Sequence, residues 1–151
     1  MRTIACVALI ALALAGGAAC GDDEPATDRD FVAELCAATR TLEERLAPAI
    51  AAASEETDPA RALEALVGPL EEFVDAFREA DPPEDLEEWH RDAGRELEEA
   101  VEHFKDEKSL AALEGFGDSP VPDPPAEAKA RLRSAARDVE ECDGVAFLKP
   151  D

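Results

Sequence analysis

A histidine on a predicted helix is the residue of this chain best suited to chemistry. Glu87 precedes His90 by three residues, and Glu-x-x-His on one helix face supplies metal ligands in di-iron helical bundles. Such a centre needs a second copy of the motif, and this sequence has only one. His103 does not replace it, because its position on the same helix is turned about 140° away from His90.

Two interpretations of His90 stay open. In the first, His90 is a structural residue at the edge of the core, flanked by Trp89 and hydrogen-bonded to a neighbour. In the second, a metal- or small-ligand-binding bundle uses His90 with inward-facing carboxylates, and Glu87 and Trp89 are further ligand-facing candidates. We expect the first interpretation, and with it no metal site and no cofactor.

Motifs of known enzymes are missing from the sequence. It has no Gly-x-Ser-x-Gly, no phosphate-binding glycine loop and no Cys-x-x-Cys. The acidic clusters at 22–24 and 138–143 do not follow the calcium-loop pattern, and carboxylates on a helix point around its circumference. These clusters therefore indicate a solvated face. We expect a protein that is not an enzyme.

The first 19 residues predict a secretory signal peptide. Arg2 is followed by an uncharged run and then by the small residues at 16–19. Gly17-Ala18-Ala19-Cys20 is similar to a bacterial lipobox, after which a peptidase cleaves and Cys20 carries lipid. Gly17 stands where that motif usually has leucine. The alternative is ordinary signal cleavage, which leaves Cys20 as a free thiol.

The number of cysteines favours lipidation. Cys6 leaves with the leader, and Cys20, Cys36 and Cys142 remain. If Cys20 carries lipid, Cys36 and Cys142 can pair in an oxidising compartment. The sequence therefore predicts a signal peptide at 1–19, a tether at 20–27 with lipidated Cys20, and a disulfide-bonded domain at 28–151.

The net charge of the chain limits the kinds of partner that this domain can bind. The 151 residues hold 15 Lys and Arg against 37 Asp and Glu, for a formal net charge of −22. No basic patch is available to neutralise phosphates, which argues against nucleic acid as a partner. A domain this acidic is also repelled by anionic lipid headgroups. The attached lipid, and not the protein surface, would therefore hold it to a membrane.

Four segments with apolar residues at spacings of three and four make up the rest of the chain, with no strand-like alternation. The first begins at a capping box of Thr27 and Asp30, and its stripe runs through Pro48. The second begins at Asp58-Pro59 and continues through Pro69. We expect a kink or a break at each internal proline.

The third and fourth segments also follow prolines. The third begins after Asp81-Pro82-Pro83, and a short turn at 110–113 extends it. A proline-rich loop at 115–125 leads to the fourth, which Asp123-Pro124 opens and Gly144 ends. An apolar tail at 145–148 then folds back. The short connections predict an all-α, antiparallel four-helix bundle in up-down-up-down order, which brings Cys36 and Cys142 to one end.

Three short segments resemble those of uncharacterised helical lipoproteins of high-GC bacteria. They are 31–36, which opens the first helix, 82–90, with its Pro-Pro and Trp-His pairs, and 141–148 at the end. The resemblance implies a helical domain anchored by lipid to the outer face of the plasma membrane, and it implies no activity. We therefore expect a non-enzymatic interaction or binding module, whose protein or small-molecule partner the sequence does not identify.

Overall fold

A computed structural model describes residues 25–107 and 122–145, and its regular structure is entirely helical. The all-α prediction is confirmed for these residues, which include no strand. The leader with Cys20, the turn at 110–113, most of the proline-rich loop and the end of the apolar tail lie outside the described residues. The elements are α1 (Asp28–Glu55), α2 (Pro59–Glu79), η1 (Glu84–Leu86), α3 (Glu87–Glu107), α4 (Ala126–Ala136) and η3 (Glu140–Cys142).

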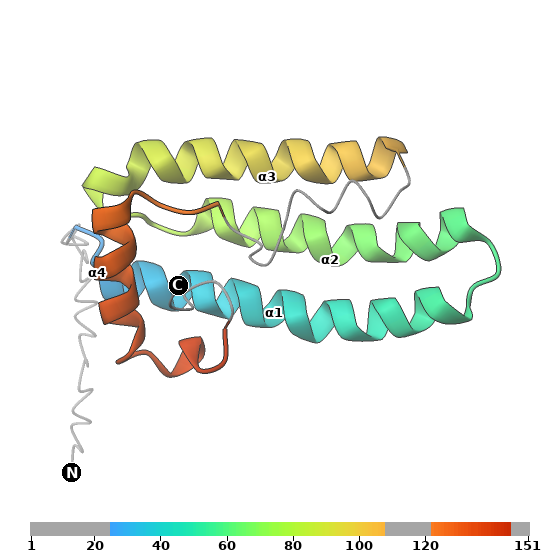
Figure 1. Ribbon diagram of the computed structural model, residues 1–151, viewed down its shortest axis with the longest axis horizontal. Helices are drawn as coiled ribbons and strands as arrows, with labels where there is room; N and C mark the ends of the chain where they lie inside the picture. Colours follow the sequence, from blue (N-terminus) through green and yellow to red (C-terminus); the bar gives the residue numbers. More distant parts are fainter. Residues whose placement is uncertain (1–24, 108–121, 146–151) are drawn as a thin grey trace, which may run out of the picture.

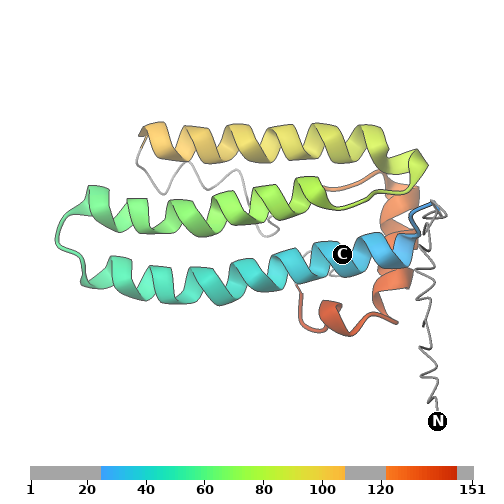
Figure 2. The same ribbon diagram turned by 180° about the vertical axis from the view of Figure 1, so that it is seen from behind.

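The three long helices lie side by side, with α2 between α1 and α3 (Figures 1 and 2). Successive helices run in opposite directions, as the sequence colours show. The much shorter α4 lies across one end of this layer, beside the start of α1 and the start of α3. Residues 25–107 and 122–145 thus hold four α-helices, as predicted, but α4 does not run alongside the other three.

Both predicted helix starts in the first half of the chain are confirmed. The backbone N–H of Asp30 donates to Thr27 Oγ1 at 3.2 Å, and that hydroxyl donates to Asp30 Oδ2 at 2.6 Å. The N–H of Ala60 donates to Asp58 Oδ1 at 3.0 Å, with Pro59 in the first turn. Each cap satisfies an N–H that has no partner within its helix.

The prolines inside α1 and α2 do not break these helices. α1 is 28 residues long and includes Pro48, and α2 is 21 residues long and includes Pro69. Of the two predicted outcomes, a break is therefore wrong for both helices, and a kink at each proline stays a prediction. A proline costs a helix one hydrogen bond and crowds the preceding turn, and both helices nevertheless stay continuous and pack against each other.

The last predicted helix is shorter than its apolar stripe. α4 ends at Ala136, before Val139 and Cys142, and the next three N–H groups bond to carbonyls three residues back. Continuing the helix would carry Cys142 away from α1, whereas the chain turns back to reach Cys36. Gly144 follows with a φ of +83°, which favours glycine.

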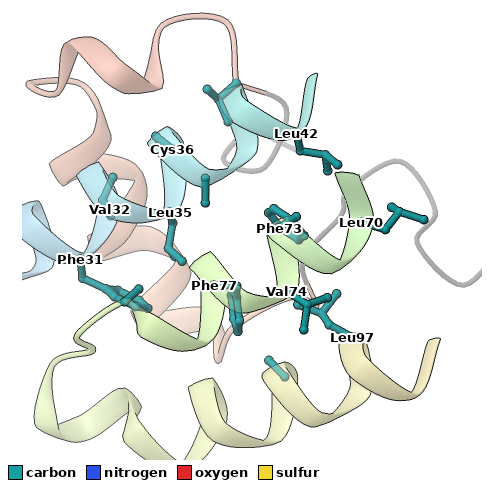
Figure 3. Packing of buried hydrophobic residues seen from close by; sticks show 14 of the residues in the cluster. Phe31, Val32, Leu35, Cys36, Leu42, Leu70, Phe73, Val74, Phe77 and Leu97 are labelled. Atoms are coloured by element: carbon teal, nitrogen blue, oxygen red, sulfur yellow. The ribbon is translucent and has the colours of Figure 1, made fainter. Parts of the chain in front are cut away.

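The core lies between α1, α2 and α3 and continues under α4. Figure 3 shows Phe31, Phe77 and Leu97 pointing from three different helices toward one another. Burying each such side chain contributes about 1.5–3 kcal/mol. The buried apolar residues that form one cluster are Phe31, Val32, Leu35, Cys36, Ala38, Leu42, Leu66, Leu70, Phe73, Val74, Phe77, Ala80, Leu86, Ala93, Leu97, Val101, Phe104, Ala128, Leu132 and Val145.

The first half of α1 is buried on two sides. The predicted stripe of Phe31 and Leu35 faces the other long helices, and a second stripe of Val32, Cys36 and Thr39 is also buried. α4 and η3 pack on this half of α1, and Cys142 Sγ lies 3.7 Å from the Val32 carbonyl oxygen. The short C-terminal elements therefore give α1 a second buried face.

Candidate functional site

His90 lies in the first turn of α3 and is 7% exposed. Its Nε2 lies 2.6 Å from the carbonyl oxygen of Phe77, in the last turn of α2. That carbonyl is among the last four of α2, which have no partner within the helix. Nε2 must donate in this bond, so the imidazole caps α2 and ties its end to the start of α3.

Aromatic rings surround the imidazole. Its centroid lies 4.8 Å from the ring of Phe77 and 5.5 Å from the ring of Phe31. Trp89 is half-buried, with its ring 6.4 Å from Phe31 and 6.2 Å from Phe77. Its Nε1 is buried and has no hydrogen-bond partner among the described residues. His90 and Trp89 thus share the junction of three helices.

The carboxylate of the sequence motif does not enter this junction. Glu87 is exposed, whereas His90, three residues later, is buried. Within residues 25–107 and 122–145, no group of three or more His, Cys, Asp or Glu side chains is placed to hold a metal ion. The acidic cluster at 138–143 belongs to these residues, and the one at 22–24 lies outside them.

A pocket of about 360 Å³ opens beside His90. Arg78 of α2 lines it, together with Arg91, Arg95 and Glu98 of α3 and with His90 itself. Sequence reasoning missed this gathering of positive charge. Arg91 and Arg95 share a helix face at a spacing of four, but no pattern in the sequence indicates that Arg78 joins them from α2.

Gly94 allows Arg78 to reach this pocket. It is buried in α3, and a Cβ there would lie 3.0 Å from Arg78 Cγ and 3.8 Å from the ring of Phe77. The stem of Arg78 therefore occupies the space that a side chain at 94 would take. Its guanidinium continues along α3 to Glu98, four residues after Gly94, with Nη1 3.2 Å from Oε2.

Cys36 and Cys142 form the predicted disulfide, which is confirmed. Their Cα atoms are 5.0 Å apart, although 106 positions separate them in the sequence. Cys36 is fully buried in α1, and Cys142 is half-buried in η3. Arg40 supports the same contact, since its Nη2 donates to the Glu140 carbonyl at 3.0 Å and to the Glu141 carbonyl at 2.7 Å.

Arg131 makes a second connection between the C-terminal elements and the rest of the domain. It donates to both oxygens of Asp28 at 2.8 and 3.1 Å and to both oxygens of Asp85 at 2.9 and 3.2 Å. One guanidinium thereby joins α4 to the start of α1 and to η1. Its hydrogen bonds hold the pKa of the Asp85 carboxyl below its usual value of 3.8.

Comparisons with protein-family models, with curated proteins and with solved structures find no match to this chain. In the part of the chain that the structure describes, no helix combines the length and the apolar character that crossing a membrane requires.

Proposed function

We propose that this protein is a lipid-anchored, extracytoplasmic binding module. In this proposal, Cys20 is the mature N-terminus and carries the lipid, and residues 20–27 tether the helical domain to the outer face of the plasma membrane. The domain, built on antiparallel long helices, then presents its acidic surface to the outside. Its resemblance to helical lipoproteins of high-GC bacteria agrees with this proposal.

The disulfide between Cys36 and Cys142 carries the proposal. Disulfides form and persist in oxidising compartments and are rare in the cytosol. This bond also uses two of the cysteines that follow the leader, so Cys20 is the one that remains for lipid. Export, lipidation and the paired cysteines are therefore consistent with one another.

Binding is favoured over catalysis by the way in which His90 is used. A general base needs a nitrogen that can take a proton from a reacting group. Catalytic histidines are commonly oriented by a carboxylate that stabilises the imidazolium they form, whereas Nε2 of His90 donates to the main-chain carbonyl of Phe77 at 2.6 Å, and the rings of Phe31 and Phe77 flank the imidazole. This environment suits a residue that positions helices.

A second candidate function is the binding of a small ligand beside His90. The observation in its favour is the pocket of about 360 Å³ that His90 lines, since ligand pockets commonly have volumes of about 300–1,000 Å³. The carboxylate-rich version of this idea would need acidic side chains directed at His90. Glu98 lines the pocket but is engaged by Arg78.

Fractionation of cells that express Cys20→Ala tests the anchor. The unmodified protein should sediment with membranes, and Cys20→Ala should move to the soluble extracytoplasmic fraction. Cys6→Ala is the matched control, because Cys6 leaves with the leader and its loss should change nothing. Mass spectrometry of the mature chain should give Cys20 as its first residue with added acyl mass. A different first residue, or membrane retention of Cys20→Ala, would refute the proposal.

A further inference from the structure

The pocket beside His90 gathers positive charge on a strongly acidic molecule. Three of the 15 Lys and Arg residues, Arg78, Arg91 and Arg95, line it. We propose that this pocket binds a phosphate group, either free phosphate and its small monoesters or the monoester headgroup of a lipid. The guanidinium groups would take the oxyanion oxygens in the forked geometry that arginine and phosphate share.

Arg91 and Arg95 are not needed to hold elements together. The ion pairs of Arg91 with Asp92, at 3.9 Å, and of Arg95 with Asp92 and Glu99, at 3.3 and 3.9 Å, all lie within α3. The two arginine side chains are 69% and 61% exposed. Exposed pairs of this kind contribute little to stability, so both guanidinium groups can turn to a ligand at small cost.

Arg78 differs, because the fold positions it. Because Gly94 has no side chain, the stem of Arg78 can lie against α3, with Cγ only 3.0 Å from the position that a Cβ at residue 94 would occupy. Its ion pair with Glu98 is half exposed, with side-chain exposures of 53% and 54%. Phosphate would replace Glu98 as the partner of Arg78, and water would solvate the released carboxylate.

His90 gives the pocket a second kind of polar group. Nε2 donates to the Phe77 carbonyl, which leaves Nδ1 of the neutral ring as a hydrogen-bond acceptor. A hydrogen phosphate ion has a P–OH donor as well as oxyanion oxygens, so it can satisfy an acceptor and several guanidinium groups together. A simple carboxylate has no such donor, and neither has a doubly ionised monoester, so the pocket best fits hydrogen phosphate or the singly ionised form of a monoester.

This inference deepens the binding role proposed above and rests on it, but it does not require lipidation or export. Its test uses the purified, disulfide-bonded mature chain. Inorganic phosphate is titrated at constant ionic strength, against sodium chloride, by calorimetry and by the fluorescence of Trp89. Trp89 is the only tryptophan in the sequence and is adjacent to His90.

The key variant is Arg91→Gln/Arg95→Gln, and its control is Arg45→Gln/Arg61→Gln. Both pairs remove two charges from exposed side chains, and the control arginines lie outside the pocket. We expect a dissociation constant on the order of 1 mM for the unchanged protein and a weakening of about tenfold or more in the key variant. The control should retain the affinity, and thermal melts verify that both variants fold.

Vesicles of phosphatidylcholine with phosphatidic acid distinguish the two sources of phosphate. The site is assigned to a lipid headgroup if the unchanged protein co-sediments with the vesicles but does not bind free phosphate. In that case Arg91→Gln/Arg95→Gln should lose the co-sedimentation, and Arg45→Gln/Arg61→Gln should keep it. Saturable binding of free phosphate with the same dependence assigns it to a soluble ligand. No binding of either probe, or equal loss in the two variants, overturns the proposal. The localisation of Cys20→Ala is independent of all these outcomes.

Discussion

Replacing Cys142 with serine tests how much of the domain depends on its disulfide. The bond closes a span of 106 positions. The loop-entropy relation assigns a constraint of this length an upper value of about 5 kcal/mol at 25 °C. Small domains unfold with only about 5–15 kcal/mol in total, so Cys142→Ser should remove a large share of the stability.

Cys142→Ser is a better choice than a change at Cys36. Cys36 is fully buried, so a serine there would add the cost of a buried hydroxyl. Cys142 is half-buried in η3, and a hydroxyl at that position stays near solvent. The double variant Cys36→Ala/Cys142→Ser provides the control for any strain that a lone thiol introduces.

Urea unfolding followed by circular dichroism, with and without reductant, is the assay. We expect reductant to lower the unfolding free energy of the unchanged protein by up to about 5 kcal/mol. It should not affect Cys142→Ser, whose stability should match that of the reduced protein. Without the bond, the C-terminal segment has only a few buried apolar side chains to hold it, namely Ala128, Leu132, Val139 and Val145. That segment should therefore detach first, and trypsin should then cleave after Arg137 before the long helices unfold.

Two results would refute this reasoning. One is a reduced protein, with two titratable thiols, that unfolds at the same urea concentration as the oxidised one. The other is a Cys142→Ser variant that reductant destabilises further. Such an effect is not expected, since Cys36 in this variant has no bond to Cys142 that reductant could break. Either result would mean that the stability of the domain does not depend on the connection between α1 and η3.

The remaining predictions concern the same end of the molecule. Because the folded-state pKa of Asp85 is depressed below 3.8, its contribution is complete above that pH and is lost as the pH falls further, through the lower folded-state pKa. Acid also relieves the self-repulsion of the negatively charged chain, which changes the stability of every variant. We therefore expect the difference in melting temperature between the unchanged protein and Arg131→Gln to shrink from pH 6 to about 3. Arg61→Gln is the charge-matched control. His90→Leu should lower the unfolding free energy by about 1–3 kcal/mol, because the Phe77 carbonyl loses its donor. His90→Gln should retain part of it, and equal stability of both variants and the unchanged protein would contradict that role.

The sequence predicts the start of each of the first two helices because those signals are local. Thr27 and Asp58 cap backbone groups two or three residues away, so nothing distant has to be known. The apolar stripes of α2 and α3 are local in the same sense, since burial follows from a spacing of three and four. These features depend only on neighbours along the chain.

The end of α4 could not be predicted in this way. Its apolar stripe continues in helical phase to Cys142, and local preference alone would extend the helix to Gly144. The contact of η3 with α1 decides otherwise, since Arg40 of α1 donates to the Glu140 and Glu141 carbonyls and Cys36 bonds to Cys142. Tertiary contacts therefore override the period of the sequence.

The site beside His90 also combines features that follow from local sequence with features that depend on tertiary contacts. Burial of His90 follows from its position on the apolar face of α3, and that was predicted. Its partner, the Phe77 carbonyl, was not, because pairing the end of α2 with the start of α3 requires the geometry of the turn between them. The pocket arginines come from two helices, so only the packed structure brings Arg78 beside Arg91.

The placement of the cations explains why so acidic a chain can fold and still offer a site for an anion. Arg40 and Arg131 each join residues about one hundred positions apart, and both connect the C-terminal elements to α1. They act where their charge brings separate segments together against the general repulsion. Arg91 and Arg95 make no such connection, since their ion pairs stay within α3. Because Arg91 and Arg95 do not join separate elements, they are the basic residues most readily available to a ligand.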